Sequence, residues 1–437
     1  MTHADGASRP PGPDLSFLDL AAQDRERSAR RRTWIAFGFS GVITLVWLIA
    51  VVAGGLFPRV WDNIVAAPTM LFGSFVAGAT PQGGGAVAFP VFTKGLGIPS
   101  EVARTFSLAI QSIGMTSAAF AIIVRQRAIS MPAVLWSVPF GLIGLFAGFW
   151  LLTDSTLPFW PSVLPGVYVK VGFTLLILVM AFVVYLGSRV PVREVRTKLE
   201  PLAARQISFI VVAALIGGLA TSQVGSGVDV LLYLAIVVIL GLEPRIAVPS
   251  TVIVMAVLSV VGFVYLGLIQ GHFSITVDDG LVTSVGGVPL QDPEAYPVAR
   301  FDLLGLWLAA VPIVSWGAPI GSAFAARVTT RQLALFVVAL AAIEAVTTVI
   351  FVPELRTDPG LIAFAVIGGT VLLVALYFAA RLRHRIAGVS LDASRSLSRE
   401  HVDVGKGFGT GERRRAEAPP AEPSQAGPQE RDAEGST

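Results

Sequence analysis

Residues 64–96 read IVAAPTMLFGSFVAGATPQGGGAVAFPVFTKGL, an apolar stretch that is interrupted in its middle by the cluster Gly83-Gly84-Gly85. A membrane-spanning helix needs about 20 predominantly apolar residues. This stretch is longer than that, but it is broken. Irregular backbone at membrane depth is tolerated only where it is buried in protein or lines a cavity. The stretch therefore indicates a re-entrant hairpin of two half-helices in a polytopic membrane protein.

A second broken stretch, residues 206–241, repeats this plan. Residues 79–82 (ATPQ) precede the first glycine cluster, and residues 220–223 (ATSQ) precede a second cluster, residues 225–227 (GSG). In both stretches a Leu-Gly pair and a new apolar run follow. The matching glutamines are 141 residues apart. Such spacing predicts an internal repeat, although glycines that only permit close helix packing remain an alternative.

Charged residues are few and unevenly distributed. They make up 14% of the 437 residues, whereas soluble domains carry about 25%. Of the 61 charged residues, 43 lie in four segments: 1–33, 189–205, 270–302 and 381–437. This pattern excludes a soluble enzyme, a disordered chain and a nucleic-acid-binding protein. The absence of cysteine excludes a disulfide framework and a thiolate metal site.

The unbroken apolar runs predict eight full spans. These runs are 34–57, 102–124, 131–152, 167–187, 246–269, 302–326, 331–352 and 360–381. The first is longer than the core of a cleaved secretory signal, so we expect it to be retained. Together with the two hairpins, they predict an all-α polytopic bundle built from two repeats.

Basic residues set the expected orientation. With eight spans and two hairpins, both termini share one side, and 18 basic residues of the connecting and terminal segments fall there. Only Arg59, Arg300 and Arg356 fall on the other side. The positive-inside rule then predicts cytoplasmic termini in the cell membrane. The hairpins enter from opposite sides, so the repeats are inverted. Because hairpins that crossed twice would give the same count, ten to twelve crossings remain possible.

This arrangement divides the chain into five segments. They are a polar cytoplasmic N-terminal segment (1–33), a first transmembrane repeat (34–187), a basic cytoplasmic linker (188–205), a second transmembrane repeat (206–385) and a disordered cytoplasmic tail (386–437). The second repeat contains an extracytoplasmic loop, residues 270–300, in which Thr276–Pro289 could form a small hairpin.

Paired broken helices at matching positions are the best sequence indication of a transporter's binding site. The half-helices that start at the two glycine clusters would present free backbone N–H groups to an anion. Amide and hydroxyl side chains beside them add neutral donors, although they could also only cap the half-helices. The expected substrate-binding residues are Thr80, Gln82, Gly83, Gly84, Gly85, Thr221, Ser222, Gln223, Gly225, Ser226 and Gly227.

A second set of residues is expected to serve coupling or gating. Its members are Asp229, Glu344, Lys94, Arg104, Ser107, Gln111, Ser250 and Thr251. Ionisable residues inside a membrane are functional candidates by default. Asp229 could carry a proton or cation, or could only be stabilised by the helix dipole. Lys94 could instead reach the interface, Arg104 could pair with Glu101 or attract anions, and Glu344 has no basic partner nearby in the sequence.

The repeated glycine-rich turn, Leu-Gly pair and following Ala-x-x-Thr/Ser pattern resemble the sulfite exporter TauE/SafE family of membrane permeases. The resemblance covers roughly residues 64–385. It implies a bacterial inner-membrane protein with about eight spans and a duplicated domain. It also implies transport of sulfite or another sulfur-containing organic anion.

We therefore expect a secondary transporter for a small anion that works by alternating access in contact with membrane lipid. The alternatives are a proton- or sodium-coupled carrier of another small solute and a non-transport scaffold. We find no nucleotide-binding loop, hydrolase motif or Cys/His metal spacing in the sequence, and so expect no enzyme, cofactor, metal or nucleic-acid partner. A homodimer is possible.

Overall fold

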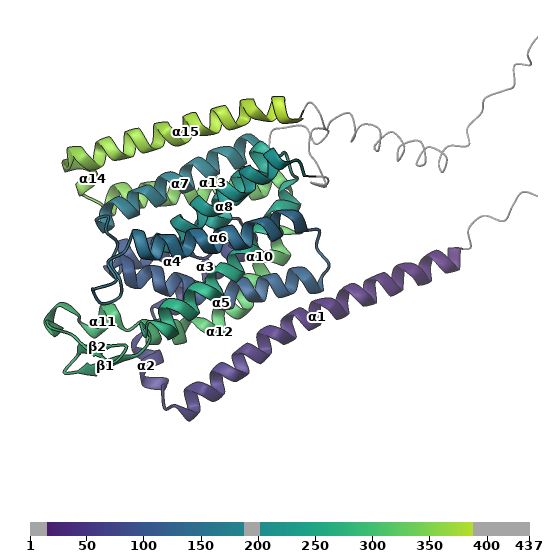
Figure 1. The fold of residues 1–437 in the computed structure, drawn as a ribbon. Coiled ribbons are helices and arrows are strands. Elements are labelled where there is room, and N and C mark those ends of the chain that lie inside the picture. Colours follow the sequence, from purple (N-terminus) through teal and green to yellow (C-terminus); the bar gives the residue numbers. More distant parts are fainter. Residues whose placement is uncertain (1–14, 188–201, 388–437) are drawn as a thin grey trace, which may run out of the picture. The chain divides into compact units, whose positions relative to one another are not determined.

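The structure is a computed structural model that describes residues 15–187 and 202–387. Most of the expected basic linker and cytoplasmic tail lies outside the described residues, as does the start of the N-terminal segment. Figure 1 shows a helical protein with one small group of strands.

The described elements follow one another along the chain. They are α1 (Leu15–Ala53), α2 (Phe57–Asp62), α3 (Ala66–Ala79), α4 (Gly85–Pro90), η1 (Val91–Gly95), α5 (Ser100–Val124), α6 (Met131–Leu151), α7 (Gly166–Gly187), α8 (Ala204–Val224), α9 (Val228–Leu234), η3 (Ala235–Ile239), α10 (Pro244–Gly262), η4 (Phe263–Ile269), β1 (Ile275–Asp278), β2 (Leu281–Val285), β3 (Val288–Pro289), η5 (Pro293–Ala295), α11 (Val298–Phe301), α12 (Leu303–Ala325), α13 (Thr330–Phe351), α14 (Glu354–Thr357) and α15 (Pro359–Ala387).

Among the described residues, eight helices are long and apolar enough to cross a membrane. They are Glu26–Ala53, Ser100–Val124, Met131–Leu151, Gly166–Tyr185, Ala204–Val224, Pro244–Ile269, Leu303–Ala325 and Arg331–Phe351. Seven of them coincide with expected spans. The remaining expected run, 360–381, lies in α15, whose described apolar part is shorter. A polytopic helical membrane protein is thus confirmed.

Both broken stretches are interrupted where the glycines lie. α3 ends at Ala79 and the chain resumes as α4 and η1, while α8 ends at Val224 and resumes as α9 and η3. The first arms differ in length, because α3 has 14 residues and α8 has 21. α8 alone is long enough to span a membrane. The sequence-based interpretation did not assign a full span to it, and the re-entrant hairpins therefore stay a proposal.

Glycines join two of the most extensive helix pairs, α3 with α12 and α6 with α8. A Cβ atom added at Gly321 would overlap a backbone carbonyl oxygen of α3, and one added at Gly144 would overlap a carbonyl oxygen of α8. Four residues away, a Cβ atom at Gly317 or Gly148 would overlap a serine hydroxyl of the partner helix, Ser74 or Ser222. G-x-x-x-G spacing lets helix backbones approach closely in a membrane. The two pairs thus pack in the same way.

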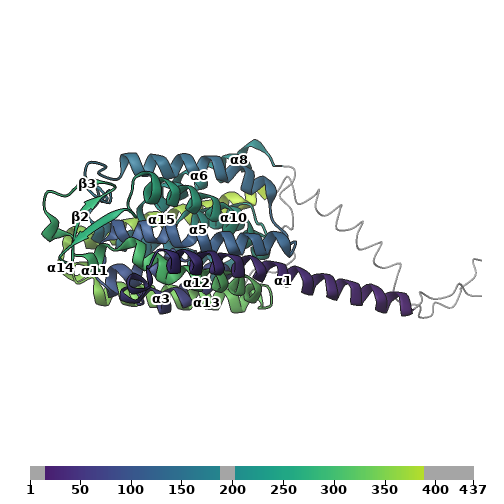
Figure 2. The same ribbon diagram turned by 90° about the horizontal axis from the view of Figure 1, so that it is seen from below.

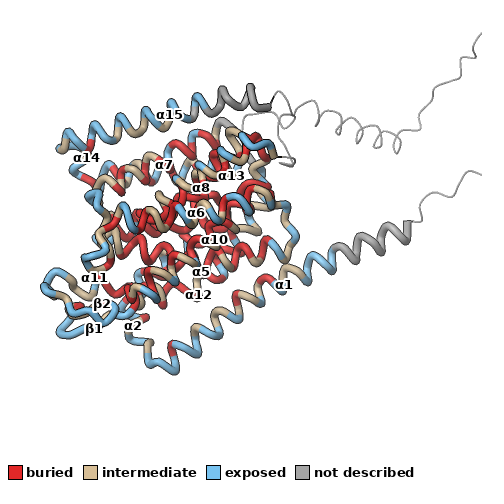
Figure 3. The backbone as a smooth tube through the Cα atoms, in the orientation of Figure 1, coloured by how far each residue is buried: buried red, intermediate tan, exposed pale blue. Residues whose placement is uncertain are grey.

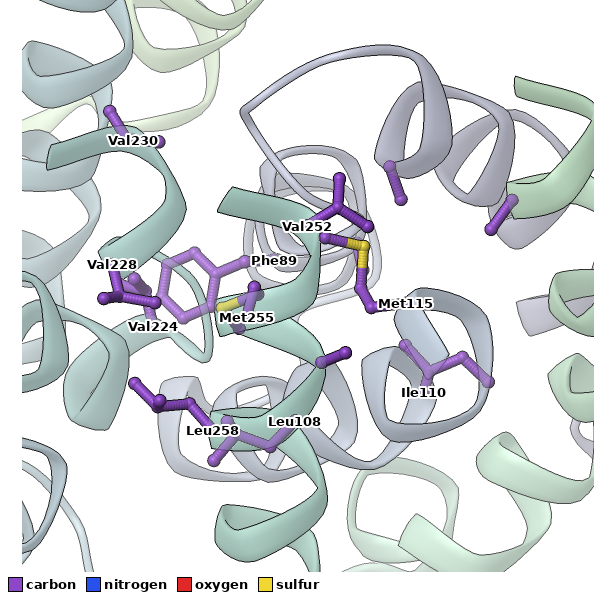
Figure 4. Close-up of a cluster of buried hydrophobic side chains, with 14 of the residues drawn as sticks. Phe89, Leu108, Ile110, Met115, Val224, Val228, Val230, Val252, Met255 and Leu258 are labelled. Atoms are coloured by element: carbon purple, nitrogen blue, oxygen red, sulfur yellow. The ribbon is translucent and has the colours of Figure 1, made fainter. Parts of the chain in front are cut away.

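Apolar side chains from both broken stretches share one core. Figure 3 shows buried residues concentrated on the central helices, including α5, α6 and α10. In Figure 4, Phe89 of α4 lies near Val224 and Val228, which flank the second break, and near Met255 of α10. Packing inside this core satisfies the requirement that broken backbone be buried in protein.

The two ends of α5 define two ends of the helix bundle. At the end near Arg104, the strands β1, β2 and β3 form an antiparallel sheet, which confirms the expected small hairpin and extends it by a third strand (Figure 2). There Asp302 caps α12 by accepting from Gly305 N at 2.9 Å, and the Arg59 guanidinium pairs with its carboxylate at 2.5 Å. The opposite end, near Arg125, contains the start of α10 and the end of α12.

Candidate functional site

The two glycine breaks touch each other inside the bundle. Ser226, in the second break, donates from its hydroxyl to the carbonyl oxygen of Gln82, in the first break, at 3.0 Å. Both residues are almost fully buried. They are 144 residues apart in the sequence. The structure thus brings together the two motifs that the sequence separates, and we call this contact region the break contact.

Polar side chains of α5 complete the break contact. Gln111 donates from Nε2 to the Gly225 carbonyl oxygen at 2.6 Å and to Ser107 Oγ at 3.0 Å. Ser107 and Gln111 are one turn apart and both lie in the first half of α5. They therefore place the break contact inside the span instead of at its end. Their expected position beside the glycines is what the structure shows.

The Asp229 carboxylate accepts hydrogen bonds from the backbone of the second break. Its Oδ1 atom accepts from the backbone N–H groups of Gly227 at 3.1 Å and Val230 at 3.0 Å, and the Ser226 hydroxyl lies 3.3 Å away. The residue is fully buried and makes no ion pair with any described residue. Its carboxylate therefore takes the N–H groups that an anion at this helix start would use.

The first break holds side-chain atoms without partners. Among the described residues, neither the Nε2 nor the Oε1 atom of Gln82 has a hydrogen-bond partner, although the side chain is 1% exposed. The Oε1 atom of Gln111 is also buried and unpartnered. A buried polar group without a partner costs about 1–3 kcal/mol. One donor and two acceptors are thus available for a ligand.

Two glycines make the close approach possible. Gly83 has φ +67°, and a Cβ atom there would lie 2.5 Å from Asp229 Oδ2 and 2.8 Å from Gln111 Oε1. A Cβ at Gly85 would lie 2.6 Å from Ser107 Oγ. Gly84 differs, because the nearest atom to its Cβ position is 3.5 Å away. A side chain at Gly83 or Gly85 would therefore collide with the polar groups of the break contact, so the close approach of the two breaks requires glycine at both positions.

Gln223 matches Gln82 in the sequence repeat, but its side-chain amide makes hydrogen bonds that the amide of Gln82 lacks. Its Oε1 accepts from the Ser162 hydroxyl at 2.7 Å, and its Nε2 donates to Ser222 Oγ at 2.9 Å. Thr221 accepts from Val228 N at 2.9 Å, so it caps the start of α9. These side chains are satisfied within the protein.

Thr80 likewise serves its own helix end. Its hydroxyl donates to the Val76 carbonyl oxygen at 3.0 Å and accepts from Gln82 N at 3.3 Å. Near the start of α10, Ser250 accepts from Ser130 N at 2.8 Å, and the Thr251 hydroxyl donates to the Val248 carbonyl oxygen. These hydrogen bonds do not connect Ser250 or Thr251 to the break contact.

Lys94 and Glu344 form a buried ion pair. Lys94 Nζ lies 2.5 Å from Glu344 Oε1, and the two side chains are 3% and 7% exposed. The alternative that Lys94 reaches the interface is therefore wrong, and Glu344 does have a basic partner, 250 residues away. Thr174 and Thr348, which the sequence analysis did not select, bind the pair at 2.8 Å each. The spacing of Glu344 and Thr348, four residues on one helix, could have suggested that they face the same side.

Arg104 holds the connection between α6 and α7. Its Nη2 donates to the carbonyl oxygens of Phe159 and Trp160 at 3.0 Å each. Both of these residues have positive φ, 59° and 52°, and the Phe159 ring lies 5.6 Å from the ring of His272. Arg104 makes no ion pair with Glu101 or any other described residue. No sequence signal marks Phe159 and Trp160, which close this end of the bundle.

Among the described residues, no group of three or more His, Cys, Asp or Glu side chains converges in a way that could hold a metal ion. The break contact consists instead of amides, hydroxyls, backbone groups and one carboxylate. Such a set can bind a small polar solute and can exchange a proton.

Comparison with known proteins agrees with this description. No curated protein and no solved structure matches the chain. A family model described as sulfite exporter TauE/SafE matches residues 66–348, which include both breaks and the charged residues Lys94, Arg104, Asp229 and Glu344. This match covers well over half of the 437 residues. The chain therefore belongs to the sulfite exporter TauE/SafE family, a family of multi-pass membrane transporters and not of enzymes.

Proposed function

We propose that this transporter moves sulfite or a related small sulfur-containing anion, and that the anion travels together with a proton. The observation that carries the proposal is the buried, unpartnered amide of Gln82 at the point where the two breaks touch. Its Nε2 atom can donate to an anion's oxygen. Neutral donors of this kind bind an anion and also release it.

The proposed proton coupling rests on the position of Asp229. An anion beside Gly83 would lie close to the Asp229 carboxylate, and two negative charges in a buried site repel each other strongly. No described cation pairs with this carboxylate. Protonation of Asp229 removes the repulsion, and the two unpartnered acceptors at the site suit a ligand that brings a proton.

Alternating access is supported by the way the two halves pack. α3 packs against α12 through Gly317 and Gly321, and α8 packs against α6 through Gly144 and Gly148. Each broken stretch therefore packs against a helix of the other half. We propose inverted repeats over residues 34–187 and 206–385, with the Arg125 end and both termini in the cytoplasm. The rocking of two such units around a fixed site is the usual form of alternating access.

Flux measurements on the reconstituted full-length chain test the proposal. We expect sulfite to enter proteoliposomes faster than protein-free liposomes, and we expect a pH-sensitive dye to report protons that move with it. Replacing sodium by potassium should change nothing. If neither sulfite nor sulfoacetate nor a carboxylate moves, the proposed function is wrong. A flux that requires sodium and ignores pH would favour the sodium-coupled alternative.

A further inference from the structure

A cavity opens at the Arg125 end between α5, α10 and α12. Its volume is about 130 Å³, and its lining combines apolar side chains with three arginines, Arg125, Arg127 and Arg245. Gly78 also lines it, two residues before Thr80 in the first broken stretch. The end of α3, which leads into the first break, therefore forms part of the cavity wall.

The arginines of this cavity lack anionic partners. None of them makes an ion pair with a described residue. Arg125 lies 5.4 Å from the ring centre of Phe37, and its Nε and Nη2 atoms are buried and have no hydrogen-bond partner among the described residues. Burial, Arg127 and Arg327 together lower the pKa of Arg125. Positive charges thus gather here without an ion-pair partner among the described residues.

The positive-inside rule alone does not explain why these arginines line a cavity without anionic partners. Arginines that only follow the positive-inside rule extend their charged groups into water, whereas two nitrogen atoms of Arg125 are shielded from it. A cavity at the opposite end of the bundle has an acidic lining, because Asp62 and Asp302 line it. There the nearby Arg59 is paired with Asp302. Of these two cavities, only the one at the Arg125 end is lined by arginines that make no ion pair with a described residue.

We propose that Arg125, Arg127 and Arg245 form an oxyanion-binding vestibule through which the transported anion reaches the break contact. The planar guanidinium group of Arg125 suits an oxyanion, to which it can offer two parallel N–H groups. The inference rests on the proposed function only for the identity of the anion. A lipid phosphate headgroup has the same oxyanion chemistry, so the test separates the two sources.

Calorimetric titration of the full-length protein in neutral detergent measures binding without transport. The protein carries Gln82→Ala, so that the break contact contributes little, and the probes are sodium sulfite and short-chain phosphatidylglycerol, with phosphatidylcholine as the neutral lipid. Arg125→Gln and Arg245→Gln remove vestibule charges. Arg331→Gln is the matched control, because Arg331 is exposed and does not line the cavity.

We expect Arg125→Gln to weaken sulfite binding about tenfold, as the loss of a charge-assisted hydrogen bond implies, Arg245→Gln to weaken it less, and Arg331→Gln to leave it unchanged. Loss of phosphatidylglycerol binding alone would uphold the oxyanion site and identify the lipid as its occupant. The proposal is overturned if both vestibule variants bind both probes as the control does. Arg245 is exposed, so its variant carries the test if Arg125→Gln fails to fold.

Failure of the vestibule and failure of the proposed function give different results. Sulfite that binds at the vestibule but is not transported contradicts only the proposed function. Sulfite that is transported with equal kinetics by the Arg125→Gln, Arg245→Gln and Arg331→Gln variants contradicts only the vestibule.

Discussion

The two glycine breaks share a sequence plan but differ in what already occupies them. In the first break the Gln82 amide has no partner among the described residues. In the second break, Asp229 accepts from the N–H groups of Gly227 and Val230, and the Gln223 amide is bound to Ser162 and Ser222. The difference teaches that a repeated motif need not repeat a role. The first break leaves an amide group unpartnered among the described residues, whereas the second holds a buried carboxylate that accepts hydrogen bonds from its own backbone.

The second arms differ as well. η1 carries Lys94, which is joined to α13 through Glu344. The corresponding η3 contains only apolar side chains, Ala235 to Ile239. The arm after the first break is thus joined to α13 by an ion pair, whereas η3 has no polar side chain that could make one.

The largest expected effect comes from breaking the ion pair between Lys94, which follows the first break, and Glu344. Lys94→Met leaves the Glu344 carboxylate buried without a cation, which should destabilise the protein by about 3–5 kcal/mol. The double variant Lys94→Met/Glu344→Leu should recover most of this loss, because no buried charge remains. Thermal unfolding in detergent measures both. Equal destabilisation of the single and double variants would contradict the importance of this pair.

A smaller loss is expected from closing the space between the breaks. Gly83→Ala combines a positive φ with a Cβ atom 2.5 Å from Asp229 Oδ2, and such strain and overpacking cost about 2–4 kcal/mol together. Sulfite flux should fall with stability. Gly84→Ala is the matched control, since its Cβ position is free to 3.5 Å. If both variants show the same stability and the same sulfite flux, the close approach of Gly83 to Asp229 does not determine either property.

The glutamines provide the most discriminating comparison, with the smallest effect on stability. Gln82→Ala removes no hydrogen bond of its side chain, so the stability should stay the same while sulfite flux falls about tenfold, as expected for one lost ligand contact. Gln223→Ala leaves Ser162 without its acceptor and should cost about 1 kcal/mol with little change in flux. Unfolding and flux measured on both variants check this reversal. Parallel effects in the two variants would mean that the breaks are equivalent.

Much of the fold could be predicted from the sequence, because helix length and glycine breaks are local properties. Seven of the expected runs are among the eight candidate spans, and both breaks lie where the glycines are. The full length of α8 was not expected, since a continuous apolar run gives no sign of where one helix ends and the next begins. The strands near Thr276–Pro289 were expected from turn residues.

The site could be predicted only in part. Gln82 and Asp229 were selected because they lie beside the breaks, and Ser107 and Gln111 because they lie on the next span, where they could face the same cavity. The structure brings all four together. The inequivalence of Gln82 and Gln223 could not be foreseen, because it depends on Ser162, which lies in a distant connection. The partner of Glu344 is likewise 250 residues away. Such pairings are made by tertiary packing and leave no local pattern.

The number of protons that accompany each sulfite ion, measured in proteoliposomes with the intact chain and with Asp229→Asn, tests the division of roles most directly. Asparagine keeps the shape of the side chain but cannot take up a proton. We predict that the intact protein moves a proton with each sulfite, and that the variant still moves sulfite but no longer responds to a pH gradient. Proton-linked sulfite flux that persists in Asp229→Asn would contradict the role of the second break.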